Sequence, residues 1–86
     1  MKFNTAIANL KEMGFVNDRD KIHIAVNRNK SLAHEDRLFD CILPAEQAEH
    51  FFGDTEIIKN DIRNKSDGNH TYPEFFFLLS YESVKE

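Results

Sequence analysis

The sequence predicts a small α+β domain, a three-stranded, mainly antiparallel sheet with helices packed mostly on one face. Two observations indicate this class. Segments with helical spacing of apolar residues alternate with segments of period-two spacing, and the run FFFLL at 75–79 is apolar on both sides. The expected order of elements is αββααβ. Because 86 residues bury too little surface for two cores, we expect one domain over residues 1–86.

A helix over residues 3–13 opens the chain. Asn4 or Thr5 can cap its start, and Gly14 suits the left-handed conformation that ends a helix. Phe15 would then fold back onto Leu10, as in a Schellman motif. The apolar face of this helix consists of Phe3, Ala6, Ile7, Leu10 and Met13.

Two strands follow, at residues 22–27 and 38–43, and both alternate in polarity as half-buried strands do. The polar segment 28–36 between them reads as an exposed loop. In the second strand, Cys41 shares a face with Phe39 and Leu43, so we expect its thiol to point into the core.

The second half of the chain predicts two helices and a final strand. Residues 44–52 form a short helix with Pro44 near its first position and Gly53 as its end. A third helix, capped by residue 54 or 55, would run to residue 65 and end in a turn at 66–69. The final strand covers about 74–84, after Pro73.

This final strand must be covered on both sides. It is therefore central in the sheet, or its second side meets another molecule. Phe75, Phe77, Leu79 and Tyr81 match the extent of the chain's own core. We therefore expect the opposite side, at Phe76 and Leu78, to be the interface of a two-fold homodimer.

Composition excludes several classes. No apolar run approaches the roughly 20 residues that a membrane span needs. The single Cys41 cannot form an internal disulfide, which favours a reducing, cytoplasmic location. We expect no metal and no cofactor, because the four histidines match no zinc pattern and the three glycines are isolated.

Catalytic residues are not expected either. Glu46 and His50 share a helical face, but this is also the spacing of an ordinary surface pair. A small histidine-dependent nuclease or hydrolase remains an alternative function. It would combine His34 with Glu35 and Asp36, or His70 with Asp67.

Charge is distributed unevenly. Residues 38–61 carry a local charge of −5, whereas residues 19–37 carry +2. The expected function is that of a non-enzymatic inhibitor or regulator of the kind that mobile genetic elements encode. An acidic helical face would occupy the basic surface of a partner that handles nucleic acid. The partner-binding residues would be Asp40, Glu46, Glu49, Asp54, Glu56 and Asp61.

Direct binding of RNA or DNA is the other alternative. It would use the loop 28–37, with Arg28, Lys30 and Arg37 on phosphates. The sequence pI of about 5.5 is far from the values of domains that depend on backbone charge, which makes this the less favoured function.

Overall fold

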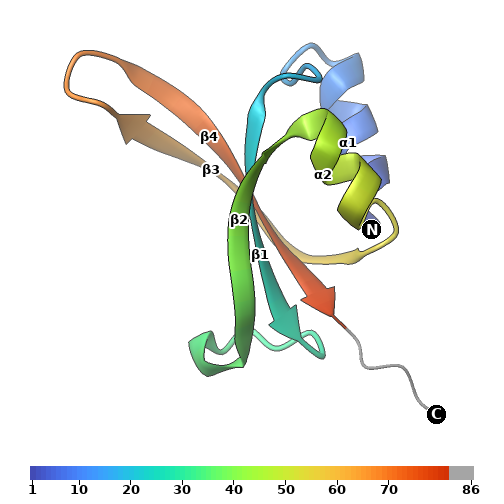
Figure 1. The fold of residues 1–86 in the computed structure, drawn as a ribbon. Helices are drawn as coiled ribbons and strands as arrows, with labels where there is room; N and C mark the ends of the chain where they lie inside the picture. Colours follow the sequence, from blue (N-terminus) through green and yellow to red (C-terminus); the bar gives the residue numbers. More distant parts are fainter. Residues whose placement is uncertain (82–86) are drawn as a thin grey trace.

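The computed structural model describes residues 1–81 and shows a four-stranded sheet with two helices on one face (Figure 1). Within these residues the strand order is β2-β1-β4-β3, with β1 and β4 parallel and both outer pairs antiparallel. The α+β class is therefore confirmed. The elements are α1 (Phe3–Glu12), β1 (Lys21–Arg28), the 3-10 helix η1 (His34–Asp36), β2 (Arg37–Pro44), α2 (Ala45–Phe52), β3 (Glu56–Ser66) and β4 (Thr71–Tyr81).

The expected third helix is wrong, because its segment forms the strand β3. Isoleucine is β-branched, which lowers helix propensity and favours a pleated surface. Ile57 and Ile62 lie opposite Leu79 and Phe75 of β4. They share the side that faces the helices, although they are an odd number of positions apart, five, because the register shifts at Ile58. The order is therefore αββαββ, and the sheet has four strands where three were expected.

The predicted turn at 66–69 exists, but it joins β3 to β4 and does not end a helix. The Asp67 carboxylate accepts hydrogen bonds from the backbone N–H groups of Asn69, at 3.2 Å, and His70, at 2.9 Å. These bonds hold the pKa of Asp67 below its usual value. Gly68 has φ +99°, a conformation that favours glycine.

The final strand is central in the sheet, which is one of the two interpretations that the sequence left open. β4 lies between β1 and β3, and its residues 75–80 lie within the ladders to both. Residues 71–74 pair only with β3, in a hairpin that projects beyond the rest of the sheet (Figure 1). Pro73 lies in this projecting part, where one side of the strand is free and a missing N–H is tolerated. Residues 82–84 of the predicted strand lie outside the described residues.

The main core fills the space between the sheet and the helices. The Phe3 ring of α1 meets the Phe77 ring of β4 edge-on, with 5.0 Å between the ring centroids. Ile7, Ile22 and Ile24 are also completely buried. Cys41 packs against this cluster as predicted, and burial raises the pKa of its thiol.

At the start of α1, backbone carbonyl oxygens and not side chains accept hydrogen bonds from the first N–H groups of the helix. The expected cap at Asn4 or Thr5 is wrong, because the helix begins at Phe3 and has no side-chain cap. The N–H groups of Phe3 and Asn4 instead donate to the carbonyl oxygens of Thr55 and Gly53, at 2.9 and 3.0 Å. The start of α1 is thereby attached to the segment that follows α2.

Backbone carbonyl oxygens also accept the hydrogen bonds at the end of α1 and at the start of α2. Phe15 N–H donates to the Leu10 carbonyl and Gly14 N–H to that of Lys11, which is the predicted Schellman motif. The first N–H groups of α2 donate to the carbonyls of Asp20 and Asp18, at 2.8 and 3.1 Å. The two helices and the turns beside them therefore form one hydrogen-bonded layer.

Candidate functional site

The six predicted partner-binding carboxylates do not share one face. Glu46 and Glu49 belong to α2, and Asp54 and Glu56 follow it directly. Asp40 lies opposite Ala25 in the β1–β2 ladder, and Asp61 lies opposite Phe76 in the β3–β4 ladder. Ladder partners share a face, so these two aspartates lie on the open face of the sheet, away from the helices. Of the six carboxylates that were expected to form one acidic helical face, only the four in and after α2 lie together in the sequence next to a helix, and Asp40 and Asp61 do not belong to that face.

The four remaining carboxylates belong to a larger acidic surface. We define the helical layer as residues 1–20 and 45–56, which contain α1, α2 and the segments that flank them. In the sequence this layer carries three basic residues, Lys2, Lys11 and Arg19, against seven acidic ones. The rest of the chain carries eight of each, so the whole formal net charge of −4 lies in the helical layer. The seven are Glu12, Asp18, Asp20, Glu46, Glu49, Asp54 and Glu56.

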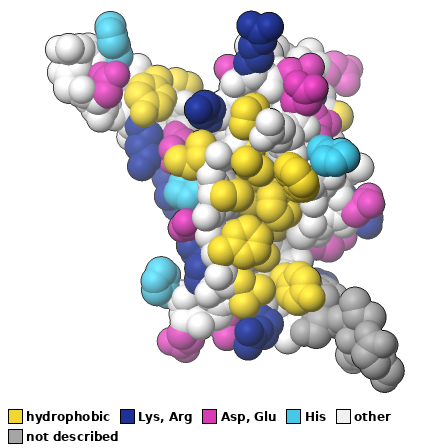
Figure 2. Space-filling view, viewed as in Figure 1, with side chains coloured by type: hydrophobic (Ala, Val, Ile, Leu, Met, Phe, Trp, Pro, Cys, Tyr) yellow, Lys and Arg dark blue, Asp and Glu magenta, His cyan; other side chains and the backbone are white. Residues whose placement is uncertain are grey.

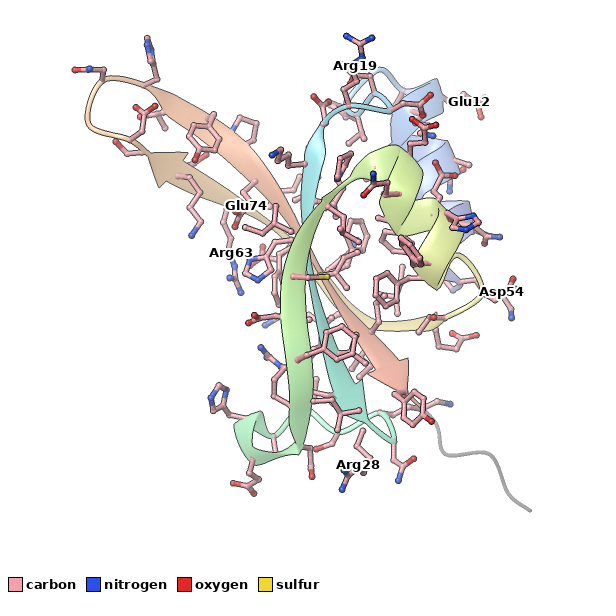
Figure 3. All side chains as sticks on the ribbon, viewed as in Figure 1. Glu12, Arg19, Arg28, Asp54, Arg63 and Glu74 are labelled. Atoms are coloured by element: carbon pink, nitrogen blue, oxygen red, sulfur yellow. The ribbon has the colours of Figure 1, made fainter. Side chains whose placement is uncertain are left out.

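Some of these carboxylates are engaged in holding the layer together. Lys11 of α1 forms ion pairs with Asp18 and with Glu49 of α2, and these two acceptors raise the pKa of Lys11. The N-terminal amine lies 3.1 Å from Glu56 Oε2 and lowers the pKa of that carboxyl group. Glu12, Glu46 and Asp54 are exposed and line the outside of the layer. Figure 3 shows Glu12 and Asp54 near its two ends.

A second charged cluster crosses the open face of the sheet. His23 of β1 stands between two carboxylates, with Nδ1 3.5 Å from Glu74 Oε1 and Nε2 3.9 Å from Asp40 Oδ2. Lys65 lies 3.7 Å from Glu74, and Arg37 lies 3.7 Å from Asp40. The five side chains form one line across all four strands, in which Glu74 and Asp40 each lie between His23 and a cation, on the side where Figure 3 places Glu74.

Phe76 and Leu78 lie beneath this charged cluster and are covered within the chain. Each is only 5% exposed, and both pack with Ala25 and Ile58 in a small second core. The guanidinium carbon of Arg63 lies 3.9 Å from the centre of the Phe76 ring. The reason for expecting a dimer at Phe76 and Leu78 is therefore removed, although self-association itself stays a prediction.

The basic loop does not present its three cations together. Arg37 Nε donates to Asn27 Oδ1 at 2.7 Å, and the same guanidinium faces Asp40. Arg28 lies at the end of the sheet and points away from it (Figure 3). The backbone N–H of Lys30 donates to Ser80 Oγ at 2.8 Å, which fixes the loop against β4. The structure thus gives Arg37 a role in shaping the loop.

Asn27 is the residue that organises this loop, and the sequence analysis missed it. It is completely buried, and its Nδ2 donates to the carbonyl oxygens of Ser31, at 2.8 Å, and Ala33, at 3.2 Å. A signal was present, since an asparagine at the end of an alternating strand often bonds to the backbone of the following turn.

The histidines do not assemble into one centre. His34 lies in η1 and His70 in the β3–β4 turn, and these two segments lie at opposite ends of the sheet (Figure 1). The Asp67 carboxylate binds backbone N–H groups of the turn. Among residues 1–81 no group of three or more His, Cys, Asp or Glu residues is arranged to hold a metal ion.

Comparison with known protein families, with curated proteins and with solved structures finds no significant match to this chain. Neither of the two α-helices in the described part of the chain is long and apolar enough to cross a membrane. The functional argument therefore rests on the residues themselves, and above all on the separation of charge between the helical layer and the rest of the chain.

Proposed function

We propose that the protein is a non-enzymatic inhibitor or regulator whose helical layer binds a basic surface of a partner protein, one that otherwise contacts nucleic acid. The observation that carries the proposal is the concentration of the formal net charge in the helical layer. An acidic layer of this kind complements a surface that binds phosphates, and complementary charge accelerates encounter and selects the partner. The proposal includes a reducing, cytoplasmic location, based on the single Cys41.

The rigidity of the layer supports this function. The Lys11 pairs join α1 to α2, and the backbone bonds to Thr55, Gly53, Asp18 and Asp20 fix both helix starts. Glu12, Glu46 and Asp54 are thus presented on a preformed surface. A preformed surface loses little conformational entropy on binding, which favours affinity.

A charge-reversal experiment tests the proposal. The double variant Glu46→Lys and Asp54→Lys changes the helical layer by four charges and alters two exposed side chains. The matched control, Glu35→Lys and Asp61→Lys, makes the same change at two exposed positions outside the layer. Each protein is used to capture nucleic-acid-binding proteins from a cell extract, and association with the captured partner is then timed at low and high salt.

We expect the helical-layer variant to associate at least about tenfold more slowly than the parent at low salt, and the control to stay close to the parent. Excess oligonucleotide should release the partner, because both ligands use the same basic surface. Equal association rates for the two variants would contradict the proposal. So would salt-sensitive binding of the oligonucleotide by this protein itself, which would support the nucleic-acid alternative.

A further inference from the structure

The two outer strands of the sheet differ in how their free edges are protected. Within the described residues β2 pairs with β1 alone, so it leaves one row of backbone N–H and C=O groups without a strand partner. β3 pairs with β4, and the start of its outer edge is bonded to residues Met1 and Lys2, so only the rest of that edge is without a strand partner in this part of the chain. Along β3 charges recur at Lys59, Asp61, Arg63 and Lys65, a pattern that discourages edge-to-edge pairing. Along β2 the charges are Arg37, its first residue, and Asp40, so residues 38–43 carry one charge.

Apolar side chains surround the free edge of β2. Leu38, Phe39 and Ile42 are exposed on this strand. Figure 2 shows a band of hydrophobic side chains over β2 and the neighbouring α2. This band continues the edge of the sheet onto the helix.

Phe51 extends the band on α2. At 100° per residue, Phe51 lies on the flank of α2 opposite Glu49. Glu49 faces α1 through its pair with Lys11, so Phe51 faces the outer side of the layer, above the β2 edge. This aromatic side chain is 65% exposed. A strand edge and an apolar helix flank therefore form one surface.

We propose that a second copy of this chain covers this surface, through antiparallel pairing of β2 with β2 across a two-fold axis normal to the sheet. Such an interface uses the same patch on both copies, and it satisfies both rows of free backbone groups. The result is a continuous eight-stranded sheet, since each copy contributes four strands. Both helical layers lie on the same side of it, which makes the dimer bivalent toward a basic partner.

Charge selects the register. In a two-fold antiparallel pair, residues that share a face lie opposite one another, so one residue of β2 lies opposite its own copy. Asp40 at the centre would place two carboxylates directly opposite each other, which is unfavourable. Cys41 at the centre avoids this, and it sets Phe39 opposite Leu43 of the second copy. Of the registers that avoid this contact, the one centred on Cys41 pairs the most of β2, with Leu38 opposite Pro44 of the second copy, and it is the register that we propose.

A pair of matched substitutions tests the dimer. Ile42 on β2 and Ile62 on β3 are 55% and 60% exposed, and each lies on an outer strand. The parent should sediment at micromolar concentration with about twice the 10.0 kDa chain mass. In the register centred on Cys41, residue 42 lies opposite Asp40 of the second copy, so Ile42→Glu places like charges opposite each other. Ile42→Glu should raise the dimer dissociation constant at least about tenfold, whereas Ile62→Glu should leave it within about twofold. Circular dichroism checks that each variant is folded.

The helix flank offers a second matched pair. Phe51 and Met13 are 65% and 62% exposed, and of the two only Phe51 belongs to α2, the helix that packs on β2. We expect Phe51→Lys to weaken the dimer and Met13→Lys to leave it intact. A parent that is monomeric at these concentrations overturns the proposal. A dimer that Ile42→Glu and Phe51→Lys leave unchanged also overturns it, and neither result would affect the charge argument for the helical layer.

Discussion

Replacement of Phe76 by alanine tests whether the open face of the sheet is a true second core. The ring is 5% exposed, packs against Leu78, Ala25 and Ile58, and lies beneath the Arg63 guanidinium. Loss of a buried phenylalanine ring costs about 3 to 5 kcal/mol. A chain of 86 residues has a total stability of about 4 to 13 kcal/mol, so Phe76→Ala should remove a large share of it.

Urea unfolding followed by circular dichroism, at one fixed protein concentration, measures this loss. The matched control is Phe15→Ala, because Phe15 is exposed and should change stability by no more than about 0.5 kcal/mol. A double-mutant cycle with Arg63→Ala should give a coupling of about 0.5 to 1 kcal/mol for the contact between guanidinium and ring. A loss below about 1 kcal/mol for Phe76→Ala would refute the reasoning, because the ring would then be accessible in solution.

Three further predictions concern the supports of the helical layer and the hairpin. Lys11→Met should lower stability by about 0.5 to 1 kcal/mol at neutral pH. Because the folded-state pKa of Lys11 is raised, the difference in urea midpoint should fade as the pH rises above 10.5, and a constant difference would exclude the ion pairs as its cause. Gly53→Ala would place a Cβ atom 2.6 Å from the Glu49 carbonyl oxygen and should cost about 1 to 3 kcal/mol, so an unchanged Tm contradicts this close approach. Asp67→Ala should lower the Tm at neutral pH, and because the pKa of Asp67 is depressed, the difference from the parent should vanish as the pH falls well below 3.8; a difference that persists in acid would assign the effect to another cause.

Local patterns predicted most of the fold. The first helix, the β1–β2 pair, the second helix and the central place of the last strand all follow from spacing, caps and composition. The error at β3 has a specific cause. Ile58 and Ile62 are four positions apart, as on one face of a helix, but the register shift at Ile58 places them on opposite faces of the sheet, Ile58 against Phe76 and Leu78 and Ile62 opposite Phe75. The sequence alone does not reveal such a shift, because it exists only in the pairing with β4.

The charged residues of the candidate site were less predictable, because their arrangement also depends on how the strands pair. The carboxylates of α2 and the residues after it could be found by counting charges along the chain. Asp61 was placed with them because the predicted third helix contained it, and Asp40 because it belongs to the acidic stretch 38–61. The line from Asp40 through His23 to Glu74 joins residues from three strands, and only the sheet register brings them together.

The central claim is that the helical layer, and not the open face or the basic loop, contacts the partner. Chemical-shift mapping of the labelled protein with its captured partner tests this claim most directly. We predict that the perturbed amides fall within residues 1–20 and 45–56, and that they return to their free positions when Glu46 and Asp54 are both changed to lysine. Perturbation concentrated in the loop 28–37, or around His23 and Glu74 on the open face, would contradict the account.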